Sequence, residues 1–425
     1  MKKLLICGRL FTSESETVQE NMAVVLNGNK IEEIIPAAAV LNRDIYDEVI
    51  DLSDRFVMPG LFDCHTHVAV NGTFDELGDD VRYSRLPATY ALRGVNYARD
   101  DLMAGFTSIR DLGCCPEWAD VCIRDSIDSG AYPGPRMMVA GLTLNAAGGH
   151  GDNSFLPPFS GLGKDNVRAI ICGPDQARQA ARMNFKYGAN CLKFMATFGV
   201  LSRSDDPGPQ ELTYEEMRAA IEIAEFRGYT SCAHAEGRVG INVAVRAGVT
   251  SIEHGVFMDE ETACLMAEKG TFLVPTLVTM GRMLKNMKPG DFPDYVADKI
   301  KRCSQVHAAT VNMAYRNGVK IAFGTDVGAP YLPHGSQAEE FVYLVHEAGL
   351  KPEHALQAAT KVSAETLHWD DRLGTITPGK LADIIAVEGN PVEDISVMQK
   401  VSFVMKDGTV YKNDAQSLVG KGERQ

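Results

Sequence analysis

Residues 59–67, Pro-Gly-Leu-Phe-Asp-Cys-His-Thr-His, are the most informative segment of this 425-residue sequence. The apolar residues predict a buried strand, and His65 and His67 lie at its end. Because side chains alternate between the two faces of a strand, histidines two residues apart point to the same side and can hold one metal ion. An H-x-H pair by itself also occurs in packed cores, so its meaning depends on the rest of the chain.

On both sides of this segment, short apolar runs alternate with helix-length segments. The eight candidate strands are residues 56–68, 107–112, 136–142, 191–196, 229–235, 251–254, 271–277 and 320–326, and the helical candidates include 88–104, 174–187, 213–227, 237–247 and 336–348. This alternation predicts an α/β fold with a parallel sheet, and the count of eight favours closure into a (β/α)8 barrel. An open doubly wound sheet is the alternative, but no G-x-G-x-x-G follows an early strand to support it.

The two ends of the chain have strand-and-turn character. Residues 22–26 and 31–35 flank Asn27-Gly28, which is a strong hairpin signal. Residues 382–387 and 401–405 read as further strands, and Asp407-Gly408 then turns the chain into residues 409–411. Neither end has enough strands to bury a core alone. We therefore expect residues 1–58 plus 376–425 to form one small β-sandwich domain, with the barrel, residues 59–375, inserted between its halves.

The bulk composition narrows the function. With 42 Lys and Arg against 56 Asp and Glu, the formal net charge is −14, which argues against a nucleic-acid partner. No apolar run approaches the roughly 18 residues of a membrane span, and the first one stops at Ile6, short of a secretory signal. The ten cysteines include no C-x-x-C pair. We expect a cytoplasmic homo-oligomer that acts on a small molecule.

Ligand-type side chains recur near the carboxyl ends of the predicted strands. Lys193 lies in the fourth strand, His234 ends the fifth, His254 ends the sixth and Asp326 ends the eighth. Catalytic groups of a barrel belong at this edge. Each residue has a structural alternative, as a core histidine, a snorkelling lysine or a helix-capping aspartate. Six such residues on successive strands, with the H-x-H pair included, favour a metal centre.

This ordered set resembles the amidohydrolase superfamily over nearly the whole chain, including the split β-domain. Three strings support a closer placement: Ala147–His150, the weaker Gly199–Ser202, and Gly324–Asp326 with His334-Gly335. They are similar to the binuclear subgroup that contains Xaa-Pro dipeptidases (prolidases) and imidazolonepropionase-like hydrolases.

The resemblance implies two divalent ions, expected to be Zn²⁺, with these ligands: His65, His67 and Asp326 on the more buried ion, His234 and His254 on the more exposed one, and Lys193 between them. A free ammonium beside two dications would be repelled. Reaction with CO2 would convert Lys193 to an anionic carbamate with one oxygen for each ion. Two ions lower the pKa of a shared water and polarise the scissile carbonyl. Asp326 would take the proton of that water and pass it to the leaving amine.

Four residues are candidates for substrate contacts. His150, in a glycine-rich loop, would polarise the carbonyl or bind substrate, and His334 is a second candidate contact. The guanidinium of Arg203 could clamp a carboxylate. Glu236 could accept an ammonium, but it departs from many relatives, which carry an aromatic residue or histidine at this place. This departure concerns which substrate groups the site recognises, rather than whether it binds metal.

Together these features predict a metal-dependent hydrolase that cleaves an amide or peptide bond of a small, carboxylate-bearing substrate. A Xaa-Pro-like dipeptide or an N-acyl amino acid is the preferred substrate. The alternatives are a cyclic-amide hydrolase, such as an imidazolonepropionase-like enzyme, and a mononuclear aminohydrolase (deaminase). A catalytically inactive barrel that serves as a scaffold is a third alternative, against which the complete set of six ligands argues.

Overall fold

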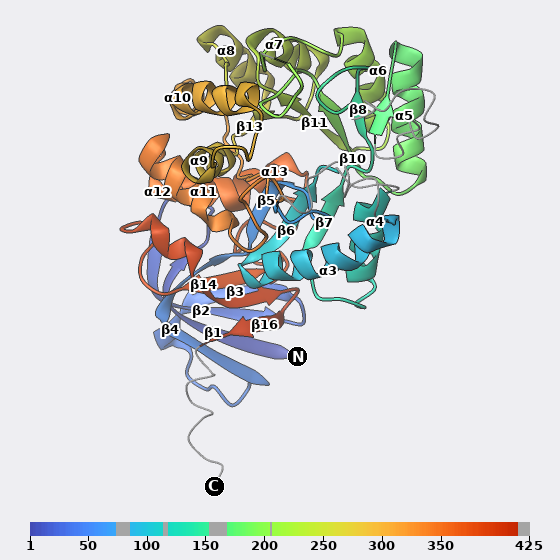
Figure 1. Ribbon diagram of the computed structural model, residues 1–425. Helices are drawn as coiled ribbons and strands as arrows, with labels where there is room; N and C mark the ends of the chain where they lie inside the picture. The colour runs from blue at the N-terminus through green and yellow to red at the C-terminus, as the bar shows by residue number, and fades with distance from the viewer. Residues whose placement is uncertain (74–85, 114–117, 153–167, 205, 415–425) are drawn as a thin grey trace.

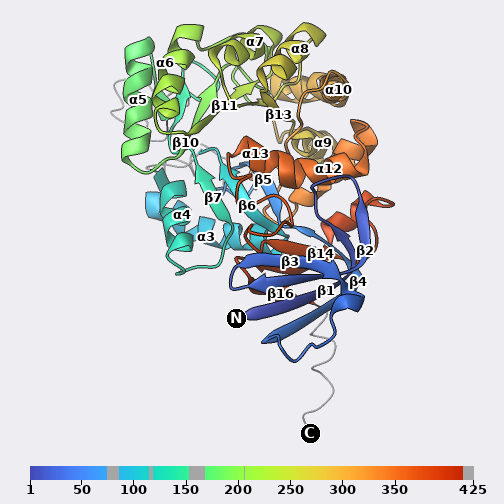
Figure 2. The ribbon, with the colours of Figure 1, turned by 180° about the vertical axis from the view of Figure 1, so that it is seen from behind.

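The computed structural model describes residues 1–73, 86–113, 118–152, 168–204 and 206–414. A β-sheet built from the two ends of the chain lies beside a larger unit of strands and helices (Figure 1). The same arrangement is seen from behind in Figure 2. Among the described helices, none has the length and apolar character needed to cross a membrane.

The terminal sheet has seven strands in the order β16-β15-β14-β4-β1-β2-β3. Their bounds are β1 Lys2–Phe11, β2 Val18–Asn27, β3 Lys30–Pro36, β4 Glu48–Pro59, β14 Ile384–Val387, β15 Val401–Lys406 and β16 Thr409–Asn413. Strand β4 joins the two halves, because it pairs with β1 in parallel and with β14 antiparallel. The predicted pairing of the chain ends is thus confirmed, as is the β2–β3 hairpin, where Gly28 has φ of +63°. The exact domain boundaries stay a prediction.

The prediction that residues 56–68 form a single barrel strand is wrong. The segment consists of the end of β4 and the separate strand β5 (Leu61–Thr66), which belong to different sheets. The chain passes between the sheets at Gly60, where a Cβ atom would lie 2.2 Å from Oγ1 of Thr107. The two sheets share one hydrophobic core, in which Phe56 from β4 and Leu61 from β5 are both buried.

The second unit is built from parallel strands. They are β5, β6 Phe106–Asp111, β7 Arg136–Val139, β8 Thr143–Asn145, β9 Arg168–Ile170, β10 Cys191–Met195, β11 Thr230–Ala235, β12 Ser251–His254 and β13 Phe272–Val274. The predicted strands 136–142 and 271–277 are shorter than expected. The first ends at Val139 with β7, and β8 begins only at Thr143. The second ends at Val274 with β13, before the helix that begins at Leu277.

Backbone hydrogen bonds connect these strands around a ring. The amide of Asn190 donates to the carbonyl of Val139 at 2.9 Å and so joins the strand groups of β7 and β10. The predicted eighth strand forms isolated bridges: Ile321 pairs with Leu273 of β13, and Val327 pairs with Thr66 of β5. Residues 320–327 therefore lie between β13 and β5, in the position of an eighth barrel strand.

Helices cover the outside of the strands, and both views show α5 to α8 following one another around it (Figures 1 and 2). The longer helices are α3 Pro87–Met103, α4 Ala119–Asp128, α5 Pro174–Lys186, α6 Tyr214–Glu225, α7 Arg238–Ala247, α8 Glu260–Lys269, α9 Leu277–Asn286 and α10 Asp294–Arg316. Four of the predicted helices match α3, α5, α6 and α7. Helix α6 begins with a capping box, in which Thr213 and Glu216 bond each other's backbone amides.

The described residues also contain shorter helical segments: η1 Ala37–Ala39, η4 Gln337–Glu339, α11 Glu340–Val342, η5 Tyr343–Glu347, α12 Pro352–Gln357, η6 Ala358–Val362, α13 Ser363–Thr366 and η7 Ile395–Gln399. The predicted helix 336–348 is therefore not one regular α-helix. It is a 3-10 turn, a short α-helical segment and a π-helical segment in succession.

Candidate metal centre

Four histidines from three separate segments of the sequence meet at the carboxyl ends of the barrel strands. His65 comes from β5, His67 follows it, His234 comes from β11 and His254 ends β12. The ring centroid of His65 lies 5.3 Å from that of His67 and 5.0 Å from that of His254, and the His234 and His254 centroids are 4.8 Å apart. The four rings thus form a continuous chain of contacts.

Asp326 and Lys193 approach the same cluster. Oδ1 of Asp326 lies 3.0 Å from Nε2 of His67 and 3.5 Å from Nε2 of His65, and Nζ of Lys193 lies 3.5 Å from the same His65 nitrogen. One ligand atom each from His65, His254 and Asp326 fall within 4.8 Å of one another. This group of three has the donor types and the spacing to hold a metal ion.

The hydrogen bonds of three rings favour metal binding through Nε2. Nδ1 of His65 lies 2.8 Å from Oε2 of Glu253, Nδ1 of His67 lies 3.0 Å from the Gly113 carbonyl, and Nδ1 of His254 lies 2.7 Å from Oγ1 of Thr276. Metal-binding histidines are typically oriented by such bonds from the second ring nitrogen. His234 differs, because its Nε2 lies 3.3 Å from the Phe198 carbonyl.

The electrostatics of the cluster also fit a metal site. Burial lowers the pKa of His65, His234 and His254 well below its ordinary value, and neighbouring basic groups, including Lys193, lower it further. The neutral imidazole, with a free lone pair, is the form that binds a metal. The backbones of His254 and Asp326 have φ of +71° and +62°. Such strained conformations in residues other than glycine gather at functional sites.

A buried ion pair lies directly beneath the cluster, and the sequence analysis did not identify it. Nη2 of Arg110 donates to Oε1 of Glu253 at 2.8 Å, Nη1 donates to Ser251 at 3.1 Å and Nε donates to the Cys64 carbonyl at 2.7 Å. Both charged side chains are fully buried. The signal for this pair was present in the sequence, since each charged residue interrupts an apolar strand one or two residues before the strand ends.

Asp63 provides a second support from β5. Its carboxylate accepts hydrogen bonds from the hydroxyl of Thr325 at 2.6 Å and from the amide of His65 at 3.0 Å. Burial raises the pKa of Asp63 to about 8, against the lowering effect of these bonds. The side chain ties the eighth-strand position to β5 immediately beside the histidine pair.

His150, predicted in the loop after the third strand, reaches the cluster. Its ring stacks on that of His234, with the centroids 4.2 Å apart and the planes 6° from parallel. Nδ1 of His150 lies 2.7 Å from Oγ of Ser202. The structure therefore brings together all the residues predicted as ligands and His150.

The other three predicted substrate contacts lie in different settings. Glu236 is buried beneath the turn that follows β10, where its Oε1 accepts the Val200 amide at 3.2 Å, and burial raises its pKa to about 8. Arg203 is exposed on the same turn. Nδ1 of His334 lies 2.9 Å from Oδ2 of Asp101, and its Nε2 lies 2.9 Å from the carbonyl oxygen of Val70. Substrate roles for these residues stay predictions, and His334 would need to release one of its two bonds.

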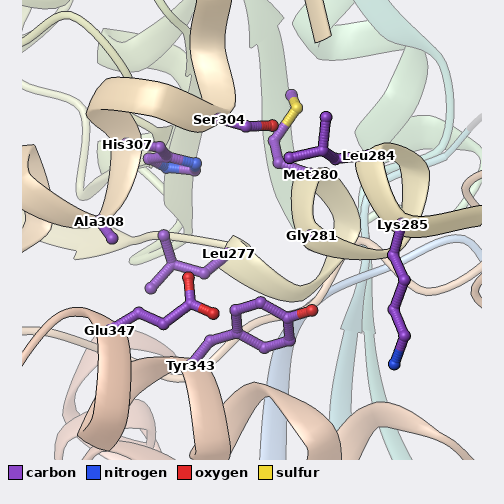
Figure 3. A pocket seen from close by; sticks show the side chains of 10 residues that line it. All are labelled: Leu277, Met280, Gly281, Leu284, Lys285, Ser304, His307, Ala308, Tyr343 and Glu347. Atoms are coloured by element: carbon purple, nitrogen blue, oxygen red, sulfur yellow. The ribbon is translucent and has the colours of Figure 1, made fainter. Parts of the chain in front are cut away.

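A pocket opens on the flank of the barrel, between α9, α10 and η5 (Figure 3). None of the residues that line it is a predicted site residue: Leu277, Met280, Gly281, Leu284, Lys285, Ser304, His307, Ala308, Tyr343 and Glu347. Nε2 of His307, in its wall, donates to the carbonyl of His254 at 2.9 Å. The pocket thus lies behind the backbone of the cluster, so we place the candidate site at the strand ends and not here.

A parallel barrel that gathers histidines, an aspartate and a lysine at the carboxyl ends of its strands has the architecture of a metal-dependent hydrolase. The model of the amidohydrolase family matches residues 56–411, and the chain belongs to this family. The protein is therefore an enzyme, an amidohydrolase, as the sequence predicted.

Three known proteins illustrate the similarity. One is a Xaa-Pro dipeptidase whose crystal structure has bound methionine in the active site. Its sequence is 35% identical, the match covers 97% of this chain and 100% of the dipeptidase chain, and the TM-score is 0.89. Ochratoxinase from Aspergillus niger is 31% identical over 435 residues, which cover 96% of this chain and 86% of the relative. Imidazolonepropionase from Pseudomonas fluorescens is 24% identical over 396 residues, which cover 87% and 88%. The predicted resemblance is confirmed.

Proposed function

We propose that this amidohydrolase uses two divalent ions, expected to be Zn²⁺, to cleave an amide or peptide bond of a small substrate that bears a carboxylate. A Xaa-Pro-like dipeptide or an N-acyl amino acid is the substrate class that we favour. The proposal depends above all on one observation, the approach of Lys193 Nζ to 3.5 Å from Nε2 of His65 inside a cluster of buried imidazoles.

Lys193 is 1% exposed, so an ammonium at this position would be a charge held away from water. It would also repel cations bound by the histidines. A carbamate formed from the amine and CO2 reverses the sign of the charge and offers two oxygens. In this proposal Lys193 would serve as a ligand to both ions, and the remaining ligands would divide as the family resemblance implies: His65, His67 and Asp326 for one ion, His234 and His254 for the other.

When bound, the two ions would supply an activated water and a polarised carbonyl. The chain itself would move the proton and orient the substrate. Asp326, with Oδ1 3.0 Å from His67, is the carboxylate at the cluster that could accept the proton of the attacking water and deliver it to the leaving amine. His150, stacked on His234, is placed to hydrogen-bond the oxygen of the scissile carbonyl.

The preference for a carboxylate-bearing substrate is supported by the relatives and by charge. The similar Xaa-Pro dipeptidase holds methionine, a free amino acid, in its active site. Arg203 supplies an exposed guanidinium on the turn beside His150 and is our candidate partner for such a carboxylate. Glu236 remains the candidate for a substrate ammonium, although its Oε1 already accepts the Val200 amide. A cytoplasmic location and a homo-oligomeric state also remain part of the proposal.

The test combines metal analysis with a substrate screen. We expect close to two divalent ions per chain, loss of activity with a chelator, and release of amine from dipeptides and N-acyl amino acids. The screen should include cyclic amides and amino-substituted heterocycles as controls for the alternative activities. One ion or none in fully active enzyme, with ammonia released from a heterocycle, would reject the binuclear proposal in favour of a deaminase.

A further inference from the structure

The turn formed by residues 199–202 packs against the edges of two active-site rings. A Cβ atom at Gly199 would lie 2.7 Å from Nε2 of His234 and 2.8 Å from Cε1 of His150. Real Cβ atoms do not tolerate such distances, so only glycine allows the backbone to approach both rings. The string Gly199–Ser202, a weak signal in the sequence, therefore has a steric reason at its first residue.

Ser202, at the other end of the turn, connects the backbone to His150. Its Oγ lies 2.8 Å from the amide nitrogen of Gly199 and 2.7 Å from Nδ1 of His150. An amide nitrogen can only donate, so one lone pair of the hydroxyl is used by Gly199. The hydroxyl hydrogen needs an acceptor of its own, and among the described residues Nδ1 of His150 lies at hydrogen-bond distance and can accept it. Ser202 is 4% exposed, so water competes little for this bond.

The turn is anchored from below by a residue nearly one hundred positions away. Lys299 of α10 is fully buried, and its Nζ donates to the carbonyls of Ser202 at 2.7 Å and Gly199 at 3.2 Å. Glu236 accepts the amide of Val200 in the middle of the turn. Because these bonds hold both ends and the middle of the turn, they keep the Ser202 hydroxyl within hydrogen-bond distance of His150.

We propose that Ser202 is a positioning residue that sets the tautomer of His150. The hydroxyl donates to Nδ1, so the neutral ring carries its hydrogen on Nε2 and can donate it to the oxygen of the scissile carbonyl. The opposite tautomer would present a lone pair to that oxygen and repel it. The catalytic consequence rests on the proposed function, whereas the tautomer itself does not.

The tautomer can be measured without substrate. In the full-length protein as isolated, labelled with ¹⁵N-histidine, long-range proton–nitrogen correlation distinguishes protonated from unprotonated ring nitrogens, and His150→Asn identifies the His150 signals by their loss. We expect Nε2 to be protonated in the wild type and both tautomers to be populated in Ser202→Ala. Ser204→Ala, on the same loop, should leave the spectrum unchanged. A hydrogen on Nδ1 in the wild type, or no change in Ser202→Ala, would overturn the proposal.

A double-mutant cycle then tests whether Ser202 acts through His150. Ser202→Ala should lower kcat about tenfold, the effect of one lost hydrogen bond, with little change in KM. Ser202→Thr, which keeps the hydroxyl, should retain most of the activity. His150→Ala should lower kcat by about 10²–10³, as loss of an oxyanion donor does, and adding Ser202→Ala should lower it no further.

These outcomes distinguish a failure of the positioning role of Ser202 from a failure of the proposed function. Additive losses in the double variant would show that Ser202 does not act through His150, and would overturn the positioning role. If no amide substrate is cleaved but the wild-type ring carries its hydrogen on Nε2, the proposed function fails and the tautomer assignment stands.

Discussion

Nδ1 of His65 and Oε2 of Glu253 lie 2.8 Å apart, although 188 positions separate the two residues in the chain. The second carboxylate oxygen of Glu253 accepts the guanidinium of Arg110 at the same distance. All three side chains are buried. The carboxylate thereby fixes the orientation of the His65 ring and directs its Nε2 toward the cluster, while Arg110 balances the charge of Glu253 within the barrel.

We therefore predict that Glu253→Gln weakens metal binding about 10–100-fold, because an amide holds the imidazole less strongly than a carboxylate does. Metal affinity of the metal-free protein, measured by competition with a chelating dye, checks this. Thermal stability should also fall, since Arg110 loses its charged partner in the core. Glu268→Gln, at an exposed position of α8, is the control. Unchanged affinity in Glu253→Gln would contradict the orienting role.

Lys193→Ala should lose most of the bound metal and of the activity if the carbamate bridges the ions. Elemental analysis and kcat measure the two losses, and electron density in a crystal of the wild type should extend beyond Nζ. Lys269→Ala, exposed at the end of α8, should change neither quantity. An active Lys193→Ala enzyme with normal metal content would identify Lys193 as an ordinary barrel lysine.

Asp326→Asn should lower kcat by more than the roughly 10²–10⁴-fold that general acid–base catalysis contributes, because the substitution also damages a proposed ligand. Steady-state kinetics should be accompanied by metal analysis of the same preparation, so that lost metal and lost proton transfer are told apart. A variant that keeps most of its kcat would place the base elsewhere, with His150 as the next candidate.

Arg203→Ala should affect substrates with a free carboxylate much more than their amidated analogues. A charged group left without its partner on binding costs on the order of 1–3 kcal/mol, which is roughly 5–150-fold in kcat/KM. The measurement is kcat/KM for each acid and for its amide. The acid-to-amide ratio of the variant is then compared with that of the wild type. Equal losses on both would remove Arg203 from substrate recognition, and a wild type without preference for the acid would favour the cyclic-amide or deaminase alternative.

The stability of the protein should depend on pH through Glu211, which accepts the backbone amide of His150. Burial raises the pKa of Glu211 to about 7 from an ordinary value of 4.5. A raised carboxyl pKa favours the folded state below the ordinary value, and this contribution is lost as the pH rises through about 7. The neutral Glu211→Gln variant has no such loss, so its Tm relative to wild type should be several degrees higher at pH 8 than at pH 5.

Thermal unfolding of both proteins across this range measures the difference. Glu215→Gln, an exposed neighbour on α6, provides the matched control and should show no comparable trend. A constant difference between Glu211→Gln and wild type would mean that Glu211 does not titrate in this window.

The sequence by itself was sufficient for features that local patterns specify. Helix periodicity located α3, α5, α6 and α7, and the Asn27-Gly28 turn located the first hairpin. The six ligand-type residues were found because each polar residue stands near the end of an apolar run, and parallel strands of a barrel end at one common edge. Chain order and strand direction are enough to bring such residues together.

Tertiary structure alone decided the contacts between residues that no local pattern relates. The break at Gly60 and the bond from Glu253 to His65 depend on how distant strands pack. The same holds for Glu236. Its candidate role toward a substrate ammonium was predicted from residue type, whereas its burial and its bond to the Val200 amide depend on the folded chain. A sequence records which groups are available, whereas burial and the choice of hydrogen-bond partner depend on the neighbours that the folded chain supplies.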